Sequence, residues 1–376
     1  MAEYTGTSIT VWYVNAGTGL DGDTPADNTA QDRGKSASKA FDTIQFAFDK
    51  LVDSTIADGD EIRIMGTSDD ATNYGISAKL TCTWAGKEVV ITGANSSGVV
   101  DGTVVEINGD GLDDTTPMLE ISVATVDNVC FSNLNFDADN VAQHCVEVTV
   151  ANNNQVTWLN CQFQKATSHG VYMNNLAQYW SFINCRANNN GDAGIEHQSS
   201  NYGLTYKCLF DENAGDGLRV GIAARVASCV FHNNGDDGLL IHNSGTVICD
   251  CVFDGNTGDG AYVSSSGQST WVNNLFTNNL AKGLNVASGS EARSFNAAFY
   301  NNNKWTGTGG TDHFSSFNHI QLAEVTYGTT ADFDFTPNGD SSVVGAGIPT
   351  HYRFFGSTAS DIGLNKWVNT EKISVF

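Results

Sequence analysis

The sequence is poor in proline and in basic residues. Its 376 residues include four prolines, and 18 lysines and arginines stand against 42 aspartates and glutamates, a net charge of −24. No cluster of basic side chains is present, and phosphate backbones need such clusters, so we expect no nucleic-acid partner. No stretch approaches the roughly 18 apolar residues of a membrane span. We therefore expect no membrane insertion.

The N-terminus lacks the features of a secretory signal, since residues 1–5 offer neither a basic segment nor an apolar one. The nine cysteines are an odd number, and their spacing matches no zinc pattern. Cys249 and Cys251, one residue apart, are predicted to point the same way on a strand. Unpaired thiols without a signal predict folding in a reducing cytoplasm. A chain that has lost its leader is the alternative.

Glycine and asparagine are abundant instead. There are 39 glycines, and about one residue in ten is asparagine. Apolar residues make up 40% of the chain, enough to build a core, so the composition excludes wholesale disorder. It also offers too little helix-forming sequence for an α fold. The question is what so much glycine and asparagine does.

A repeated phrase occupies the middle of the chain. It reads small-x-Phe, then Asn three residues after the Phe, a turn, and Gly-apolar-x-apolar. Successive copies start 21 to 27 residues apart, at Leu134, Cys161, Cys185, Cys208, Cys229, Cys251, Asn274 and Ala297. The Phe position holds Phe136, Phe163, Ala187, Phe210, Phe231, Phe253, Phe276 and Phe299. The Asn position holds Asn190, Asn213, Asn234, Asn256, Asn279 and Asn302, and a glycine follows at 170, 194, 217, 238, 260 and 283.

Each repeat contains three short strand-like stretches, as at 229–231, 238–241 and 246–248. Three strands and three turns in about 22 residues predict one coil of a parallel β-helix. The consensus of leucine-rich repeats is missing, and propeller blades are about twice as long. The predicted fold class is therefore an all-β, right-handed parallel β-helix with coils of about 21–27 residues.

Stacked coils would turn each repeated position into a ladder with a spacing of about 4.8 Å. The phenylalanines would form an internal aromatic stack, and the cysteines from Cys161 to Cys251 a column of small buried thiols. The asparagines would bond amide to amide at a tight turn, whose left-handed backbone asparagine tolerates. The glycines would serve the other corners.

The two ends differ from the repeat. Residues 10–14 read as a strand, and Phe41, Ile44, Phe48 and Leu51 are spaced for one face of a helix that would cover the first coil. Strands are predicted at 60–65, 89–92, 104–107 and 119–123. After Asn302 the rhythm fails. We thus divide the chain into an N-terminal cap (1–60), a β-helix (61–304) and a C-terminal cap or oligomerisation segment (305–376).

The sequence resembles the right-handed parallel β-helix superfamily, which includes pectate-lyase-like enzymes, alginate epimerases and phage tailspikes. The resemblance rests on the repeat, on residues 13–17 with 41–45 at the start, and on residues 360–363 near the end. It implies a fold and leaves the activity open. In enzymes of this family the site lies on one lateral face. Their lyases use an Arg or Lys base and often calcium, and their hydrolases use paired carboxylates.

The candidate site residues flank the repeat glycine and are expected to point outward. The position before it holds His169, Ala193, Asp216, Asp237, Asp259 and Lys282, and the position two after it holds Tyr172, Glu196, Arg219, Leu240, Tyr262 and Asn285. Glu196, Arg219 and Asp237 are the catalytic candidates, and Tyr172, Tyr262 and Asn285 the substrate-binding ones. Asp216, Asp237 and Asp259 would stack about 5 Å apart, which would raise a pKa or recruit calcium.

Plainer interpretations apply to the same residues. Asp-Gly is an ordinary turn dipeptide, and Glu beside Arg on neighbouring coils is an ordinary surface pair. His232 and His242 are expected to be solvent-exposed. Polygalacturonase-like hydrolases carry an Asp-Asp pair and a Gly-His-Gly segment; Asp236-Asp237 supplies the pair, but Gly-His-Gly occurs nowhere in the sequence.

Two classes of function stay open. The first is a structural virion protein of a bacteriophage: a head-decoration, fibre or spike subunit, forming a homotrimer with other virion proteins as partners and able to bind a surface polysaccharide. It would fold in the host cytoplasm and reside in the virion. The second is an extracellular lyase or glycoside hydrolase acting on an acidic polysaccharide. A surface adhesin is disfavoured because it needs an export signal.

Overall fold

The structure of the chain is a computed structural model. It describes residues 9–16, 34–53, 55–66, 74–84, 86–122, 127–149, 154–173, 178–264, 267–295, 297–302, 304–308, 313–317 and 320–321.

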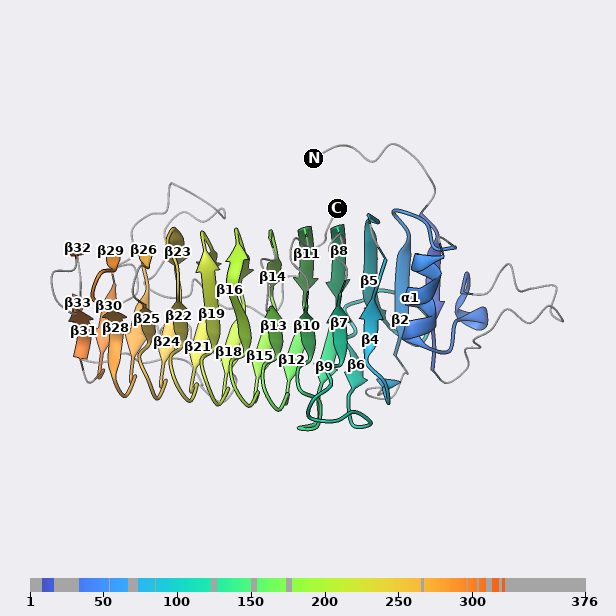
Figure 1. Ribbon diagram of the computed structural model, residues 1–376, viewed down its shortest axis with the longest axis horizontal. Helices are drawn as coiled ribbons and strands as arrows, with labels where there is room; N and C mark the ends of the chain where they lie inside the picture. Colours follow the sequence, from blue (N-terminus) through green and yellow to red (C-terminus); the bar gives the residue numbers. More distant parts are fainter. Residues whose placement is uncertain are drawn as a thin grey trace.

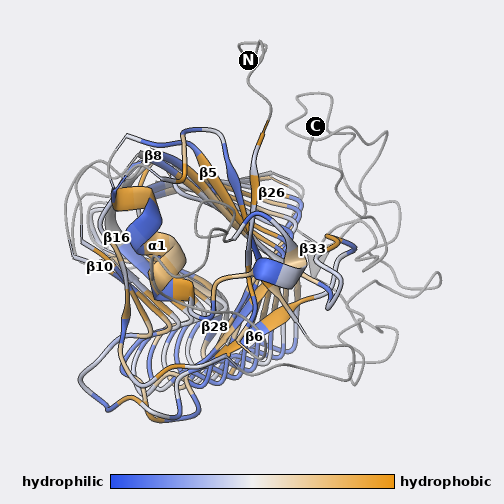
Figure 2. Ribbon diagram, turned by 90° about the vertical axis from the view of Figure 1, so that its right-hand side faces the viewer, coloured by the Kyte–Doolittle hydropathy of each residue, from blue (hydrophilic) through white to orange (hydrophobic). Residues whose placement is uncertain are grey.

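Three parallel β-sheets form the sides of a long prism (Figure 1). From β2 onward consecutive strands belong to different sheets, and each strand pairs in parallel with the strand one coil later. Seen along its axis, the coils superpose in a three-sided outline (Figure 2). The all-β parallel β-helix predicted from the repeat is confirmed.

The first sheet has 12 strands. They are β1 (Val11–Val14), β2 (Glu61–Met65), β5 (Val89–Ala94), β8 (Asp127–Ser132), β11 (Asn154–Leu159), β14 (Ser181–Ile183), β17 (Leu204–Tyr206), β20 (Arg225–Ala227), β23 (Thr246–Cys249), β26 (Gln268–Val272), β29 (Glu291–Phe295) and β32 (His313–Phe317).

The second sheet has 10 strands. They are β4 (Leu80–Cys82), β7 (Leu119–Ile121), β10 (Val146–Val148), β13 (Val171–Met173), β16 (Ile195–Asn201), β19 (Leu218–Ile222), β22 (Leu239–Ile241), β25 (Ala261–Val263), β28 (Lys282–Val286) and β31 (Lys304–Thr308).

The third sheet has 11 strands. They are β3 (Tyr74–Gly75), β6 (Val105–Asn108), β9 (Leu134–Asp137), β12 (Gln162–Gln164), β15 (Arg186–Asn188), β18 (Leu209–Asp211), β21 (Val230–His232), β24 (Val252–Asp254), β27 (Leu275–Thr277), β30 (Ala298–Tyr300) and β33 (Ile320–Gln321).

The phenylalanine ladder lies inside the third sheet. Phe210, Phe231, Phe253, Phe276 and Phe299 are buried, and the centroids of successive rings lie 4.7 to 5.0 Å apart with nearly parallel planes. The predicted aromatic stack is confirmed. Offset stacking of buried rings adds to the burial of their apolar surface, so this column stabilises the contact between successive coils.

The asparagine ladder closes the corner after the third sheet, as predicted. Each Nδ2 donates to the Oδ1 one coil later, at 2.9 Å from Asn190, 3.0 Å from Asn213 and 2.8 Å from Asn279. Each Nδ2 also donates to a main-chain carbonyl one coil earlier, which for Asn234 is that of Phe210 at 3.1 Å. Every buried amide is therefore satisfied along the column.

The left-handed backbone of this corner belongs to the residue before each ladder asparagine. Asn189, Glu212, Asn233, Asn278 and Asn301 have φ between 49° and 56°, and Gly255 has φ 69°. Our expectation that the ladder asparagines themselves adopt it is wrong. They bond between coils, and the preceding residue makes the bend.

The repeat glycines also have a different reason from the one expected. They are absent from the glycines with positive φ. A Cβ on Gly238 would lie 2.5 Å from the carbonyl oxygen of Gly260 and 2.9 Å from Nδ2 of Asn256. The column is glycine because the coils approach each other too closely there for any side chain.

All nine cysteines are free thiols, as expected. Cys161, Cys185, Cys208, Cys229 and Cys251 form the predicted buried column. Cys249 and Cys251 do not share a strand, however. Asp250, with φ 55°, turns the chain between them, so Cys251 is buried and Cys249 only partly so. The single-residue spacing marks a corner here.

The N-terminal helix α1 (Ile44–Val52) lies across the open end of the prism (Figure 2). The hydroxyl of Thr43 caps it by accepting the N–H of Phe46, and Ile44, Ala47, Phe48 and Leu51 are buried. A short 3-10 turn, η2 (Ala37–Lys39), precedes it. The predicted helical cap is confirmed. No helix in the described ranges has the length and apolar character needed to cross a membrane.

At the other end, parallel pairing continues past the boundary we expected at residue 304. β31, β32 and β33 pair with β28, β29 and β30, so another coil follows Asn302 although the Phe and Asn positions no longer repeat. Most of the predicted C-terminal segment, including residues 341–347 and 360–363, lies outside the described residues.

Candidate functional site

The second sheet carries the candidate residues on its outer side. In register along the prism stand Glu120, Glu147, Tyr172, Glu196, Arg219, Leu240, Tyr262 and Asn285, which we call the outer column. The alternation of side chains along each strand turns these residues outward. The sequence predicted this alignment from Tyr172 to Asn285 correctly, and it extends to Glu120.

A second set, the corner column, precedes the sheet. In it, Oδ1 of Asp216 accepts the main-chain N–H of Asp237 at 2.9 Å, and Oδ1 of Asp237 accepts that of Asp259 at 2.7 Å. The Oδ1 of Asp259 accepts the N–H of Lys282 at 2.8 Å. These aspartates are buried, with 2 to 8% exposure, instead of facing outward as expected. The reason is that each one binds the backbone of the next coil.

Earlier in the corner column, two histidines likewise accept a backbone N–H from the next coil. Nδ1 of His144 accepts the N–H of His169, and Nδ1 of His169 accepts the N–H of Ala193, both at 3.2 Å. An Nδ1 that accepts must be unprotonated, so the proton of each neutral ring is on Nε2. Burial lowers the pKa of His144 to about 4 and also lowers the pKa of His169.

Arg219 is the centre of an ionic cluster. Its guanidinium donates to Asp216 at 2.6 Å, to Glu196 at 2.7 Å and to Asp192 at 2.7 Å. Burial alone would lower the pKa of Arg219, but hydrogen bonds to Asp216 and Glu196 hold this pKa above its usual value. The sequence predicted the pair of Glu196 and Arg219 and missed Asp192, which belongs to neither repeated position.

Tyr172 lies on an aromatic stack that sequence reasoning also missed. Its ring centroid is 4.9 Å from those of both His144 and His169, with nearly parallel planes. Nε2 of His169 lies 3.6 Å from Glu196 and 3.7 Å from Asp192. The stack therefore adjoins the Arg219 cluster, and the recurrence of histidine one coil apart was the available signal.

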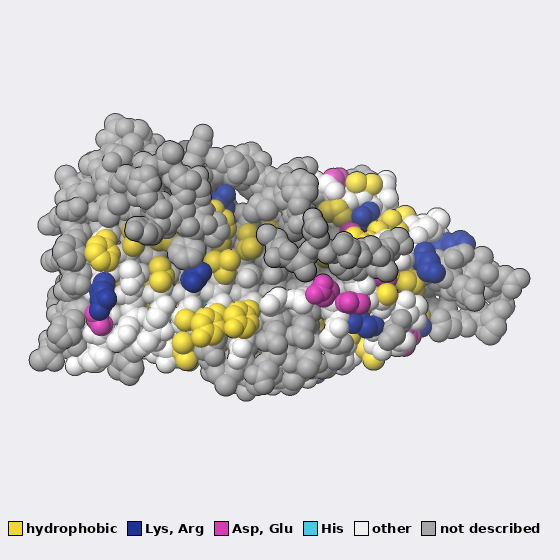
Figure 3. All heavy atoms as spheres, turned by 90° about the horizontal axis from the view of Figure 1, so that it is seen from above, with side chains coloured by type: hydrophobic (Ala, Val, Ile, Leu, Met, Phe, Trp, Pro, Cys, Tyr) yellow, Lys and Arg dark blue, Asp and Glu magenta, His cyan; other side chains and the backbone are white. Residues whose placement is uncertain are grey.

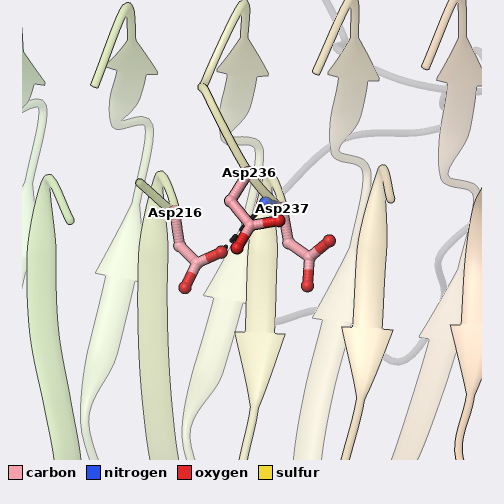
Figure 4. A group of neighbouring side chains, drawn as sticks. All are labelled: Asp216, Asp236 and Asp237. Atoms are coloured by element: carbon pink, nitrogen blue, oxygen red, sulfur yellow. Dashed lines mark hydrogen bonds between the residues drawn. The ribbon is translucent and has the colours of Figure 1, made fainter. Parts of the chain in front are cut away.

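Asp216, Asp236 and Asp237 are the described acidic group whose geometry suits a cation. One oxygen of each lies within 4.8 Å of the others, and all three belong to two adjacent corners (Figure 4). Burial, with the charges of Asp216, Asp259 and Asp236, raises the pKa of Asp237 to about 8. Carboxylate oxygens suit calcium. The group differs from the predicted trio because Asp259 is bonded instead to Lys282 and Asn285.

The substrate-binding candidates do not converge. Tyr172 and Tyr262 share the outer column, but Glu196, Arg219 and Leu240 separate them. The side-chain amide of Asn285 donates to Asp259 at 2.6 Å and accepts from Lys282 at 2.8 Å. These residues form a row along the face, a shape that suits an extended ligand.

The two histidines expected to face solvent, His232 and His242, are less exposed than that. His232 keeps 13% of its side-chain surface exposed, and its Nδ1 lies 3.2 Å from Asp254 on the next coil. His242 is half-buried, which lowers its pKa, and its Nε2 has no hydrogen-bond partner among the described residues. The expectation of solvent-exposed histidines is wrong, because both side chains are partly buried and His232 contacts the next coil.

The chemistry open to this face follows from these bonds. Arg219 is a poor general base, because its neutral form is disfavoured by three carboxylates. Glu196 keeps 13% side-chain exposure and already accepts from Arg219. Asp237, protonated near neutral pH and next to exposed Asp236, has the character of a general acid beside a carboxylate.

Comparison with known proteins places the fold. A model of the right-handed β-helix region matches residues 119–304. No sequence among the curated proteins matches the chain. Solved structures of similar fold include a pectate lyase, a virus protein and a tailspike. The pectate lyase Pel9A has a TM-score of 0.55 at 15% identity, with 94% of this chain and 96% of the lyase covered.

The other two are a virus protein and a tailspike protein. ORF18 of Geobacillus virus E2 has a TM-score of 0.55 at 16% identity, and the Dettilon tailspike protein gp208 has 0.58 at 11%. Each alignment covers 83% of this chain but only 60% and 62% of those proteins. Identities this low establish the fold alone. The three-sheet architecture and the match over residues 119–304 show that the chain has the fold of a right-handed parallel β-helix.

Proposed function

We propose that the protein is a structural β-helical subunit of a bacteriophage virion, a head-decoration, fibre or spike component that binds host surface glycan. The observation that carries this proposal is that polar side chains form hydrogen bonds and ion pairs from one coil to the next. Arg219 is enclosed by three carboxylates, and the corner aspartates hold the backbone of the next coil. Side chains that are already bonded between coils suit a rigid shaft better than a catalytic centre.

Other features support the same proposal. The nine free thiols suit folding in a host cytoplasm, and the fold is shared with a virus protein and a tailspike. A prism with flat sides lets three copies pack around an axis. The proposed assembly is a homotrimer, with other virion proteins as partners and the virion as its location.

Light scattering tests the assembly. A trimer gives about three times the 40.0 kDa of the chain at micromolar concentration. A monomer under these conditions contradicts the trimer.

A second candidate function rests on a separate observation. The raised pKa of Asp237 beside Asp236 would suit acid catalysis in a polysaccharide lyase or glycoside hydrolase, and the fold is shared with a pectate lyase over nearly its whole length. Such an enzyme would act outside the cell on an acidic polysaccharide.

One assay separates the two candidates. Acidic polysaccharides are incubated with the protein, and unsaturated products are followed by ultraviolet absorbance and new chain ends by a reducing-sugar assay. The structural role predicts no turnover. Turnover that is lost in Glu196→Gln or Asp237→Asn, but kept in the outer-column control Glu120→Gln, supports the enzyme and overturns the structural proposal.

A further inference from the structure

Two exposed tyrosines occupy a corner where the chain bends with a left-handed backbone. This corner precedes the strands of the first sheet, and strand register aligns residues 128, 155, 179, 202, 223 and 245 along it. All six have positive φ; Tyr179 has 56° and Tyr202 has 60°. Asparagine, glycine and small residues suit this conformation, whereas bulky side chains are strained in it.

The unfavourable backbone conformation of the two tyrosines is not offset by burial of their rings. Tyr179 keeps 47% and Tyr202 57% of its surface exposed. They are the two aromatic residues among the described non-glycine residues with positive φ. Because Tyr179 and Tyr202 have a strained backbone and exposed rings, we expect them to have a role other than stabilising the fold.

The two rings form an ordered stack. Their centroids lie 5.4 Å apart and their planes differ by 11°. The centroid spacing is close to that of the coils, so the two rings follow one another along the prism, and a further ring can join the stack at either end. The pair is therefore pre-organised to receive a further flat ring.

On one side the stack ends against small residues. The next two positions of the corner are Ala223 and Gly245, so no side chain continues the column beyond Tyr202. Ile222, which is 42% exposed, adjoins Ala223 and adds an apolar edge. Figure 3 shows hydrophobic side chains gathered in a short row on the face seen from above, where β16 and β19 end (Figure 1). Ala223, in register with Tyr202 one coil later, carries only a methyl group, so no ring of this corner covers that side of Tyr202.

We infer that a pyranose ring of an uncharged glycan stacks on Tyr202 above Ala223 and Gly245, and so continues the column of Tyr179 and Tyr202. Sugar rings present an apolar C–H face to aromatic rings, and this is the contact that the stack offers. The surface formed by the two tyrosines and the edge of Ile222 is too small for a stable protein partner, because such a partner needs about 800 Å² on each side. The net charge of −24 disfavours an acidic glycan.

This inference deepens the glycan-binding part of the proposed function and places it at a corner of the prism, away from the outer column. Asparagine is the informative replacement because it accepts positive φ and has no ring. Tyr202→Asn therefore removes the platform and relieves the strain together. Tyr179→Phe/Tyr202→Phe is the matched control, since it keeps both rings.

The test uses the full chain with maltotetraose, cellotetraose and mannotetraose as uncharged probes and tetragalacturonate as the acidic comparator. Saturation-transfer NMR detects binding, and calorimetric titration measures Kd. We expect at least one uncharged probe to bind more tightly than tetragalacturonate. Tyr202→Asn is expected to weaken it about tenfold or more, while the phenylalanine control stays within about threefold. The melting temperature of Tyr202→Asn should be unchanged or higher by a few degrees.

Three results overturn the inference. The first is that no uncharged probe binds to the wild type. The second is that Tyr179→Asn/Tyr202→Asn binds as the wild type does. The third is that the melting temperature of Tyr202→Asn falls by several degrees. If binding survives in Tyr202→Asn but is lost in Tyr172→Ala, the corner site fails and glycan binding by the outer column remains. The turnover and light-scattering tests judge the structural role independently.

Discussion

At the scale of the residue, single side chains link one coil to the next. A ladder asparagine such as Asn234 accepts from the backbone and side chain of Asn213 and donates to Phe210 and Asn256. The corner aspartates and histidines each accept one backbone N–H from the following coil. These groups are buried, so the loss of one partner leaves others unsatisfied.

Asn234→Ala tests the ladder. The change removes a hydrogen-bond partner from the buried amide of Asn213 and from the buried carbonyl of Phe210. We therefore expect the free energy of unfolding to fall by about 2–4 kcal/mol. Urea unfolding followed by circular dichroism measures it. Glu212→Asn is the matched control: this exposed residue has φ 56°, which asparagine tolerates, so its stability should be equal or higher. Equal losses in both variants would contradict the argument.

Asp237→Asn tests the raised pKa. Asp237 has a pKa of about 8 in the folded chain and an ordinary value of 3.8, so between these pH values the folded state holds a proton that the unfolded state has released. Stability from this group is therefore lost as pH rises from about 4 to 8. Asparagine keeps the acceptor for the N–H of Asp259 and carries no charge.

The variant should accordingly be more stable than the wild type by about 1–3 kcal/mol at pH 8 and about equal to it at pH 4. Urea unfolding at the two pH values measures the difference. A variant that is less stable at pH 8 would show that Asp237 is ionised and held by a favourable charge.

At the scale of the element, the repeat predicts whatever recurs and misses what does not. Phe231 and Asn234 were located because their columns persist for several coils. Asp192 was missed because it occurs once, and the stack of Tyr172 on His144 and His169 because histidine holds that position in only two coils. The glycine column was found from the repeat, but its cause, the close approach of neighbouring backbones, is visible only in the packed structure.

Gly238→Ala tests that cause. The added methyl would lie 2.5 Å from the carbonyl of Gly260 and 3.0 Å from Cβ of Phe231, and neither atom can move without shifting a coil. We expect a loss of about 3 kcal/mol in the free energy of unfolding. The control is Gly75→Ala, where the nearest atom, Oδ1 of Asp110, lies 3.5 Å away. A small effect at Gly238 would mean that the strands can separate there.

At the scale of the whole molecule, a stack of coils spreads its charge along one axis. The 42 acidic and 18 basic residues give a net charge of −24, and some acids, such as Asp216 and Asp237, lie in adjacent coils. Exposed ion pairs such as Arg293 with Glu291 contribute little to stability. Self-repulsion therefore outweighs the attraction that added salt would screen.

We expect the melting temperature to rise by a few degrees when sodium chloride is raised from about 20 mM to 0.5 M, because the Debye length falls from tens of ångströms to a few. Differential scanning calorimetry measures it. Calcium chloride at matched ionic strength separates general screening from binding: an additional rise with calcium that disappears in Asp236→Asn would assign the ion to Asp216, Asp236 and Asp237. A melting temperature that falls with sodium chloride would mean that favourable ion pairs, led by the cluster around Arg219, dominate the electrostatics of the prism.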